Sequence, residues 1–226
     1  MRILMQIHPV RGDLAAGFGR ARLTPAIHAT QDEPAKGEFR SLPLAGYGSR
    51  HGKPASGVHD DLYVKAVALR VRDRIGVMVG ADALIIPPQV TERVARQLQQ
   101  ELGLQREQIY LGPTHTHSGL GGWGEEIVGE LFAGGFQPEA RTSLAGQIVA
   151  AARDAVNDLK PARFGHGQLM APQFIRNRLA GGLRKDGIGV SRGKQLQERF
   201  SIELDRLLRK ILTPQWTAPT RHAAPS

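Results

Sequence analysis

The sequence contains no cysteine, and only 5% of its 226 residues are aromatic. A disulfide framework and a thiolate zinc site are therefore both excluded, while the redox compartment is left undetermined. Any bound metal ion must be held by His, Asp, Glu or Tyr side chains.

Long apolar runs are also absent. No stretch approaches the ~20 consecutive apolar residues of a membrane-spanning helix. Segment 1–12 has one brief apolar patch, which is too soon interrupted to be the core of a signal peptide. A misassigned start codon that removed an export signal would leave the same N-terminus, so localisation stays unknown. The 41% hydrophobic content is enough for the core of one or two globular domains.

Acidic residues are outnumbered, and the formal net charge is +9. Such a charge alone is compatible with binding to nucleic acid or to an anionic membrane surface. The arginines are scattered, however, and no aromatic residues alternate with them as they do on a base-stacking surface. We therefore expect no nucleic-acid partner, whereas peripheral contact with an anionic membrane surface remains a hypothesis.

Apolar patterning predicts an α/β fold. Valine-rich alternation indicates a β-hairpin, proline and glycine mark the ends of a helix, and a short apolar run indicates a following strand. The segments are 62–72 and 75–81 for the hairpin, 87–103 for the helix, 108–111 for the strand and 138–159 for a second long helix. We expect a layered α/β sandwich, with mixed sheet(s), helices packed on the faces and a site beyond a strand end.

Three further segments give weaker patterns. We expect 17–25 to be an edge strand that ends at Pro25, and 162–170 to be another strand. A short helix is expected to begin near 124–126, although Gly129 and Gly134 weaken it.

The stretch from Tyr110 to Trp123 reads Y-L-G-P-T-H-T-H-S-G-L-G-G-W and carries the chemistry of the chain. If it is extended, His115 and His117 point to the same face, because side chains two apart share a face of a strand. Neutral imidazole is a good zinc ligand. A polar loop with two solvated histidines is the alternative, since two histidines alone do not complete a zinc site.

Three other segments carry candidate polar groups. The glycine-rich loop 43–52 is either a connector or a wall of a binding site. His59, followed by two aspartates, is either a ligand or part of a turn, and turns are where aspartate is favoured. Asp82 follows the second strand of the hairpin, where it is either a site residue or a helix cap.

After 184 the sequence changes character. Segment 194–212 has apolar residues on one face and basic residues elsewhere, which predicts an amphipathic helix. The final residues, 213–226, are rich in Pro, Ala and Thr, so we expect disorder there. The expected domains are 15–184 for an α/β unit, 185–212 for the basic helix segment and 213–226 for the tail.

Taken together, the segments resemble the N-terminal part of the neutral/alkaline non-lysosomal ceramidase family. The matching motifs run in family order. They are G-F-G-R-A-R-L-T-P at 17–25, P-L-A-G-Y-G-S-R at 43–50, G-V-H-D-D-L-Y at 57–63, G-A-D at 80–82, T-H-T-H-S-G at 114–119 and R-N-R at 176–178. The resemblance covers about 15–180, and the T-H-T-H-S-G block is its most specific part.

The resemblance implies a Zn²⁺-dependent amidase of sphingolipid metabolism that cleaves the N-acyl bond of ceramide to sphingosine and a fatty acid. By position, His115 would be a zinc ligand and His117 a catalytic residue beside the metal. His59, Asp82 and Arg178 match family positions, where they would contact the substrate or orient a ligand.

The same resemblance implies that this chain is incomplete. The family's second zinc histidine, its glutamate and tyrosine ligands and its catalytic serine lie further along a much longer chain, and nothing after Arg184 matches them. Two hypotheses follow. The chain is part of a ceramidase-type hydrolase of linear amides, or it is a catalytically incompetent module that binds lipid or a partner.

Overall fold

The computed structural model describes residues 4–6, 14–34, 36–164 and 166–168. It divides into two compact units, one formed by 13–162 and the other by the flanking segments 1–12 and 163–226. In the second unit, β1 (Leu4–Gln6) pairs antiparallel with β9 (His166–Gln168). Arg178, the predicted basic helix and the predicted tail lie outside the described residues.

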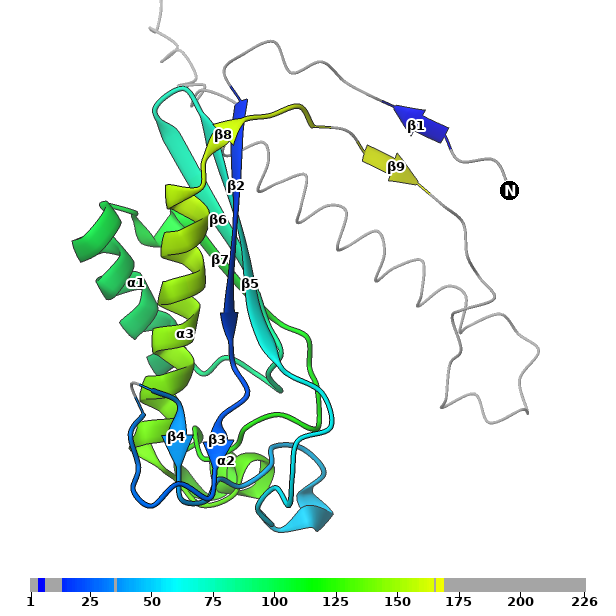
Figure 1. Ribbon diagram of the computed structural model, residues 1–226, viewed down its shortest axis with the longest axis vertical. Coiled ribbons are helices and arrows are strands. Elements are labelled where there is room, and N and C mark those ends of the chain that lie inside the picture. Colours follow the sequence, from blue (N-terminus) through cyan, green and yellow to red (C-terminus); the bar gives the residue numbers. More distant parts are fainter. Residues whose placement is uncertain (1–3, 7–13, 35, 165, 169–226) are drawn as a thin grey trace, which may run out of the picture. The chain divides into compact units, whose positions relative to one another are not determined.

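Unit 13–162 is built on one mixed sheet of five strands, which confirms the predicted fold class (Figure 1). The strand order is β7-β6-β5-β2-β8. The strands are β2 (Leu14–Arg22), β5 (Tyr63–Val71), β6 (Arg74–Ala81), β7 (Ile109–Pro113) and β8 (Lys160–Pro161). β6 and β7 are parallel, and the other neighbours are antiparallel.

The predicted edge strand, 17–25, forms the later part of β2, which begins earlier, at Leu14, and ends at Arg22. Residues 17–22 pair with β5 alone, and only the residues before them have a second neighbour. β8 pairs with Ala15 and Ala16 of β2, after the chain returns from its last helix. This pairing joins residues about 145 apart in sequence, so no local pattern announces it. The pairing of β8 with β2 depends on the position at which the chain leaves the helix Pro138–Asn157, and this position is a property of the tertiary structure.

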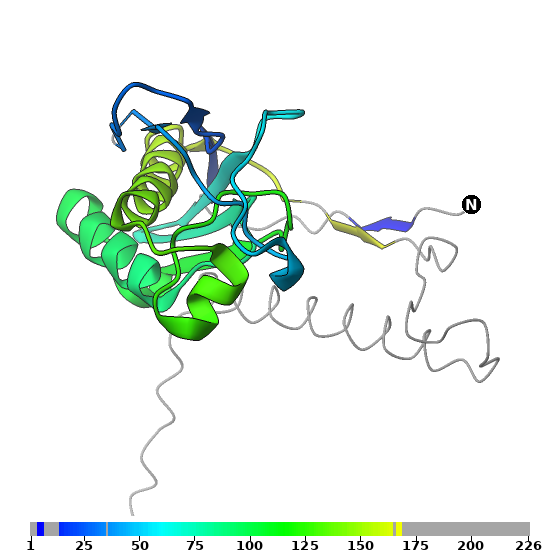
Figure 2. The ribbon, with the colours of Figure 1, turned by 90° about the horizontal axis from the view of Figure 1, so that it is seen from below.

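Two long helices lie side by side on one face of this sheet (Figures 1 and 2). They are α1 (Pro88–Leu102) and α3 (Pro138–Asn157), and each has a proline in its first turn. α1 buries Val90, Val94 and Leu98 at helical spacing, and Gly103 ends it in the left-handed conformation at φ 69°. Both predicted helices are confirmed, and their apolar stripes form the core with the inner face of the sheet.

The remaining elements are short. They are β3 (Ala26–Ile27), β4 (Glu38–Phe39), the 3₁₀ turns Gly48–Arg50 and Arg106–Gln108, and the helix α2 (Glu126–Ala133), which starts where the sequence predicts. Among the described residues, no helix combines the length and the apolar character needed to cross a bilayer.

Helix α3 packs unusually close to β2, because two strand residues on that face are glycines. A Cβ at Gly17 would overlap the carbonyl oxygen of Ala155, and one at Gly19 would overlap that of Ala151. Small residues on both elements therefore set the distance between helix and sheet.

We expect Gly19→Ala to lower the free energy of unfolding by about 3 kcal/mol, since the added methyl group must push α3 off the sheet. Gly80→Ala is the matched control, because Gly80 lies in β6 of the same sheet with open space around the position of its Cβ. Urea unfolding of the two variants checks this. Equal stabilities would contradict the close packing of β2 and α3.

Candidate functional site

The parallel pairing of β6 with β7 brings two loops to the same edge of the sheet. Ala81 pairs with Pro113, the last residue of β7. Beyond the strands the pairing continues, because the N–H of Thr114 donates to the carbonyl of Ala81 at 2.9 Å and the N–H of His115 to that of Ala83 at 3.0 Å. The candidate site therefore begins where both strands end, as is usual for such sheets.

His115 is held by both its backbone and its ring. Its φ is 62°, a left-handed conformation that is uncommon outside glycine. Its Nδ1 lies 2.8 Å from the carbonyl oxygen of Leu84. A carbonyl only accepts, so Nδ1 carries the proton and the lone pair is on Nε2. This tautomer leaves Nε2 free to accept a hydrogen bond or to bind a metal ion.

His117 lies beside His115, with 5.1 Å between ring centroids in an edge-to-face arrangement. The ring of Tyr47 lies 4.5 Å away on another side. Nδ1 of His117 is buried and has no hydrogen-bond partner. Either neutral tautomer leaves Nδ1 without a partner, but a buried N–H without an acceptor is rarer than a buried acceptor without a donor, which favours the tautomer with the proton on Nε2.

The segment 43–46 forms the wall behind His117. Gly46 has φ 87°, and a Cβ placed on it would lie 2.7 Å from Cγ of His117. Arg50 joins this wall to the loop 114–119, which follows β7 and which we call the histidine loop. The Arg50 Nη1 donates to the carbonyls of Ala45 at 3.1 Å and of His117 at 2.9 Å. The glycine-rich loop thus contacts the candidate site directly.

A short ladder of backbone hydrogen bonds aligns the two loops. Leu44 and Leu120 form an antiparallel bridge. The N–H of Ala45 donates to Gly119 at 3.0 Å, and the N–H of Gly121 donates to Pro43 at 2.7 Å. Two motifs about seventy residues apart therefore fold as one unit around the histidines.

Both imidazoles line a pocket of about 360 Å³, which we call the histidine pocket. Its other walls are apolar side chains and one glycine backbone, from the segment after β6, from Trp123 and from α2. The lining residues are Leu84, Ile85, His115, His117, Trp123, Val128, Gly129 and Phe132. The exposed lining is almost wholly apolar, and the Trp123 Nε1 donates to the carbonyl of Leu120 at 2.9 Å.

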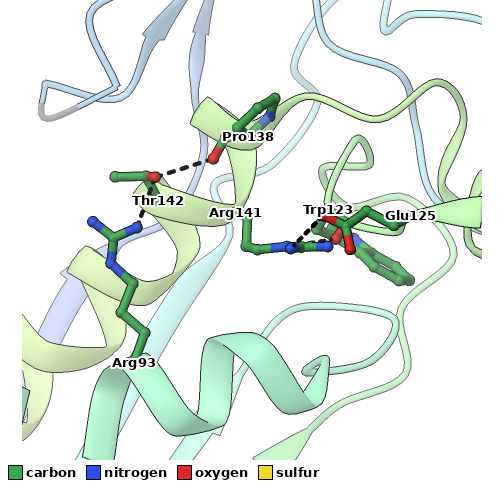
Figure 3. A network of polar contacts seen from close by, with 6 residues as sticks. All are labelled: Arg93, Trp123, Glu125, Pro138, Arg141 and Thr142. Atoms are coloured by element: carbon green, nitrogen blue, oxygen red, sulfur yellow. Dashed lines mark hydrogen bonds and ion pairs between the residues drawn. The ribbon is translucent and has the colours of Figure 1, made fainter. Parts of the chain in front are cut away.

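Arg141 of α3 fixes the segment that leads into α2 (Figure 3). Its Nε donates to the Trp123 carbonyl at 3.0 Å, and its Nη1 lies 3.0 Å from a carboxylate oxygen of Glu125. Only 14% of the Arg141 side chain is exposed. In the same figure, the hydroxyl of Thr142 in α3 accepts a hydrogen bond from Arg93 of α1 at 3.0 Å. This bond connects the two long helices beside Arg141.

His59 lies apart from the histidine pocket. Its side chain is 97% exposed, and its Nδ1 is 2.7 Å from Asp60. With Thr116 and Ser118 it lines a different cavity of about 480 Å³. The histidine loop thus separates two cavities. His115 and His117 line one, while the residues between and after them line the other.

The neighbouring carboxylates are engaged in holding the chain. Asp82 lies at the site edge, and its Oδ2 accepts from the N–H of Tyr63 at 3.0 Å. The Arg22 guanidinium, 2.8 Å from Asp61, holds the pKa of that carboxyl below its ordinary value with the help of the Thr24 hydroxyl. The predicted roles of Asp82 and His59 stay predictions.

The described residues fit one position of a zinc site. The tautomer of His115 is the one that a metal-binding histidine adopts when its other nitrogen donates to a carbonyl. No group of three or more His, Asp or Glu residues that could hold a metal ion occurs within the described residues. Because catalytic zinc needs three protein ligands, this part of the chain does not complete such a site.

The contribution of α2 to the pocket was not predicted from the sequence. Its residues E-I-V-G-E-L-F-A are apolar on more than one side, so no single stripe marked a buried face. An apolar helix that follows a glycine-rich loop was the available signal.

Fold and site together define an α/β domain whose strand-end loop presents two imidazoles to an apolar pocket. The model of the neutral/alkaline non-lysosomal ceramidase family, N-terminal part, matches residues 33–180. The chain belongs to this family, which confirms the resemblance seen in its motifs.

Individual relatives agree. The chain is 27% identical over 149 residues to the neutral ceramidase of Mycobacterium tuberculosis, a match that covers 62% of this chain and 23% of that protein. The crystal structure of neutral ceramidase from Pseudomonas aeruginosa superposes with a TM-score of 0.55 at 25% identity, over 66% of this chain and 22% of that one. A ceramidase complexed with C2 gives the same TM-score at 27% identity, with the same coverage. The chain therefore spans less than a quarter of the length of these relatives.

We expect Gly46→Ala to displace the His117 ring, since the added methyl group would occupy the position of the ring edge. Gly37→Ala is the matched control, because Gly37 also has positive φ, 73°, but has open space around it. Both variants lose about 1 kcal/mol through backbone strain. Nuclear Overhauser contacts between the Tyr47 and His117 rings should disappear only in Gly46→Ala. Their persistence in Gly46→Ala would show that the glycine does not position His117.

Proposed function

We propose that this chain is the N-terminal part of the catalytic domain of a ceramidase-type amidohydrolase, which hydrolyses the N-acyl bond of ceramide to sphingosine and a fatty acid. Membership of the ceramidase family supports a hydrolase that acts on a lipid amide. The observation that carries the proposal is the pair of imidazoles, 5.1 Å apart, at the wall of an apolar pocket.

The histidine pocket suits the acyl part of such a substrate. Its walls offer alkyl and aromatic groups from Ile85, Val128 and Phe132, which remove an acyl chain from water. The exposed lining is almost wholly apolar, and the polar side-chain groups nearest to it are the rings of His115 and His117, so an amide would find its partners only there. Apolar walls with few polar groups are typical of sites that bind lipid-like ligands.

The two rings offer different functions to an amide. His117 would offer Nε2–H as a donor to the carbonyl oxygen of the substrate, and this oxygen gains negative charge during hydrolysis. His115 presents the Nε2 lone pair, an acceptor or a metal ligand. The arrangement therefore pairs one donor and one acceptor beside the pocket.

We infer that Zn²⁺ is the cofactor and that His115 is one of its ligands, with the remaining ligands outside the described residues. Bound zinc would supply the Lewis acidity that amide hydrolysis uses. The residues described here hold His115 in the ligand tautomer and keep an apolar pocket beside it.

A non-catalytic module is the second candidate function. It is favoured by the absence, within the described residues, of any cluster that could hold a metal ion. In that case the histidine pocket would bind an N-acyl lipid without hydrolysing it. Both functions predict lipid binding, and only the first predicts turnover once the remaining ligands are supplied.

The pocket itself is tested with a water-soluble, short-chain ceramide. We expect Val128→Asn to weaken its binding about tenfold, because Val128 lines the histidine pocket and loses apolar contact. Ile127→Asn is the matched control, since Ile127 is the preceding residue of α2, is 87% exposed and does not line the pocket. Isothermal titration calorimetry measures both. Equal affinities would place the ligand elsewhere.

Zinc affinity tests the assignment of His115. We expect the chain 1–226 to bind zinc weakly, His115→Ala to remove this binding, and His28→Ala to leave it unchanged, because His28 is exposed and does not line the histidine pocket. Competition with a chromophoric chelator measures the affinity.

Release of fatty acid from ceramide by the same samples tests completeness. With too few zinc ligands, the chain alone should show little turnover. Robust turnover that His115→Ala abolishes would refute the claim that the zinc site of this chain is incomplete. His59 or Asp82 would then be the candidates for the further zinc ligands.

A further inference from the structure

An exposed apolar patch adjoins the histidine pocket. We call it the apolar rim, and it consists of Tyr47, Ile85, Ile127, Val128, Leu131 and Phe132. Ile127 is 87% exposed and Val128 is 69% exposed. Contiguous exposed apolar residues on a protein surface usually mark an interaction site.

The members of the rim adjoin one another. Ile85, Val128 and Phe132 line the histidine pocket together. The Leu131 side chain packs against Gly48, whose Cβ position lies 3.5 Å from Leu131 Cδ1, so the loop that carries Tyr47 adjoins α2. The rim is therefore continuous with the apolar lining of the pocket.

Backbone contacts prevent α2 from turning these side chains inward. Gly124 and Gly129 approach so closely that a Cβ on either would lie 2.7 Å from the other's backbone. The N–H of Gly46 donates to the Phe132 carbonyl, and that of Gly122 to the Ala133 carbonyl, both at 2.7 Å. The helix is fixed through its main chain, so Ile127 and Leu131 stay exposed while Val128 and Phe132, also exposed, line the histidine pocket.

We propose that the apolar rim is a membrane-docking surface, which inserts into the headgroup region of a zwitterionic bilayer. This rests on the proposed function, because a two-chain amide lipid resides in a bilayer and must enter the pocket from it. Short apolar helices lie at such interfaces, and exposed tyrosine at the margin is typical of them.

The acidic residues near the apolar rim favour a zwitterionic bilayer over an anionic one. Glu125, Glu126 and Glu130 lie on or beside α2 and are exposed. Carboxylates repel an anionic surface, so contact through α2 should need no anionic lipid and should persist in high salt. Contact through basic residues elsewhere in the chain would show the opposite dependence.

The test uses the full chain and vesicles of phosphatidylcholine alone. Because the chain has no cysteine, an environment-sensitive fluorophore can be attached at a single introduced cysteine. Ile127→Cys reports on the rim, and Gln100→Cys, exposed on α1, is the control. We expect vesicles to shift the emission to the blue, and lipids that carry a quencher to quench it, at 127 and not at 100.

A second arm measures association by vesicle sedimentation. We expect the double variant Ile127→Asn and Leu131→Asn to bind at least about tenfold more weakly. Phe18→Asn, which removes another exposed apolar side chain, on the sheet, should bind as the parent chain does. The double variant should keep its affinity for short-chain ceramide, since neither residue lines the histidine pocket. Loss of vesicle binding and loss of pocket function are thereby distinguished.

Three results would overturn the proposal. Vesicle binding could be unchanged in the double variant, or could require anionic lipid and disappear in high salt. The label at 127 could instead be shielded without vesicles, at all protein concentrations if the chain itself covers α2, or only at high concentration if a second copy does.

Discussion

The parallel pairing of β6 with β7 is the constraint on which the site depends. Because Ala81 lies opposite Pro113, the segments that follow both strands leave the sheet together and continue to exchange backbone hydrogen bonds. Those bonds hold His115 in a left-handed conformation and place its Nδ1 against the Leu84 carbonyl. The helix α1 makes this possible, since parallel neighbours need a long crossover connection. The register of the two strands therefore determines the orientation of the His115 ring, and this orientation determines its tautomer.

Glycines allow the loop 43–46, the histidine loop and α2 to approach one another closely. Gly46 lies against the ring of His117, Gly121 lies against the Ala133 carbonyl, and Gly124 lies against Gly129. At each point a Cβ would force the backbones apart, so the loop wall, the histidine loop and α2 can close around one pocket only with glycine there. The same close approach leaves α2 with its apolar side chains outside. Pocket and apolar rim therefore arise from one packing solution.

The sequence predicted what local patterns encode. The hairpin over 62–81 and the helix that ends at Gly103 were predictable, because alternation, proline and glycine act over a few residues. The pairing of segment 43–46 with 119–121 was not, since it joins residues more than seventy apart. The histidine pair was recognised from its motif, whereas its apolar wall from α2 was missed. Helix periodicity does not tell which side of an apolar helix faces a pocket and which faces outward.

The central claim is that His115 and His117 are held in opposite tautomers at one apolar pocket. Long-range ¹H–¹⁵N spectra of the imidazoles, assigned with single His→Gln variants, test it directly. The account predicts that at neutral pH His115 is protonated on Nδ1 and His117 on Nε2, and that short-chain ceramide shifts the signals of both rings. Two rings that both average over the tautomers, as free histidine does, and that do not respond to the ligand would contradict it.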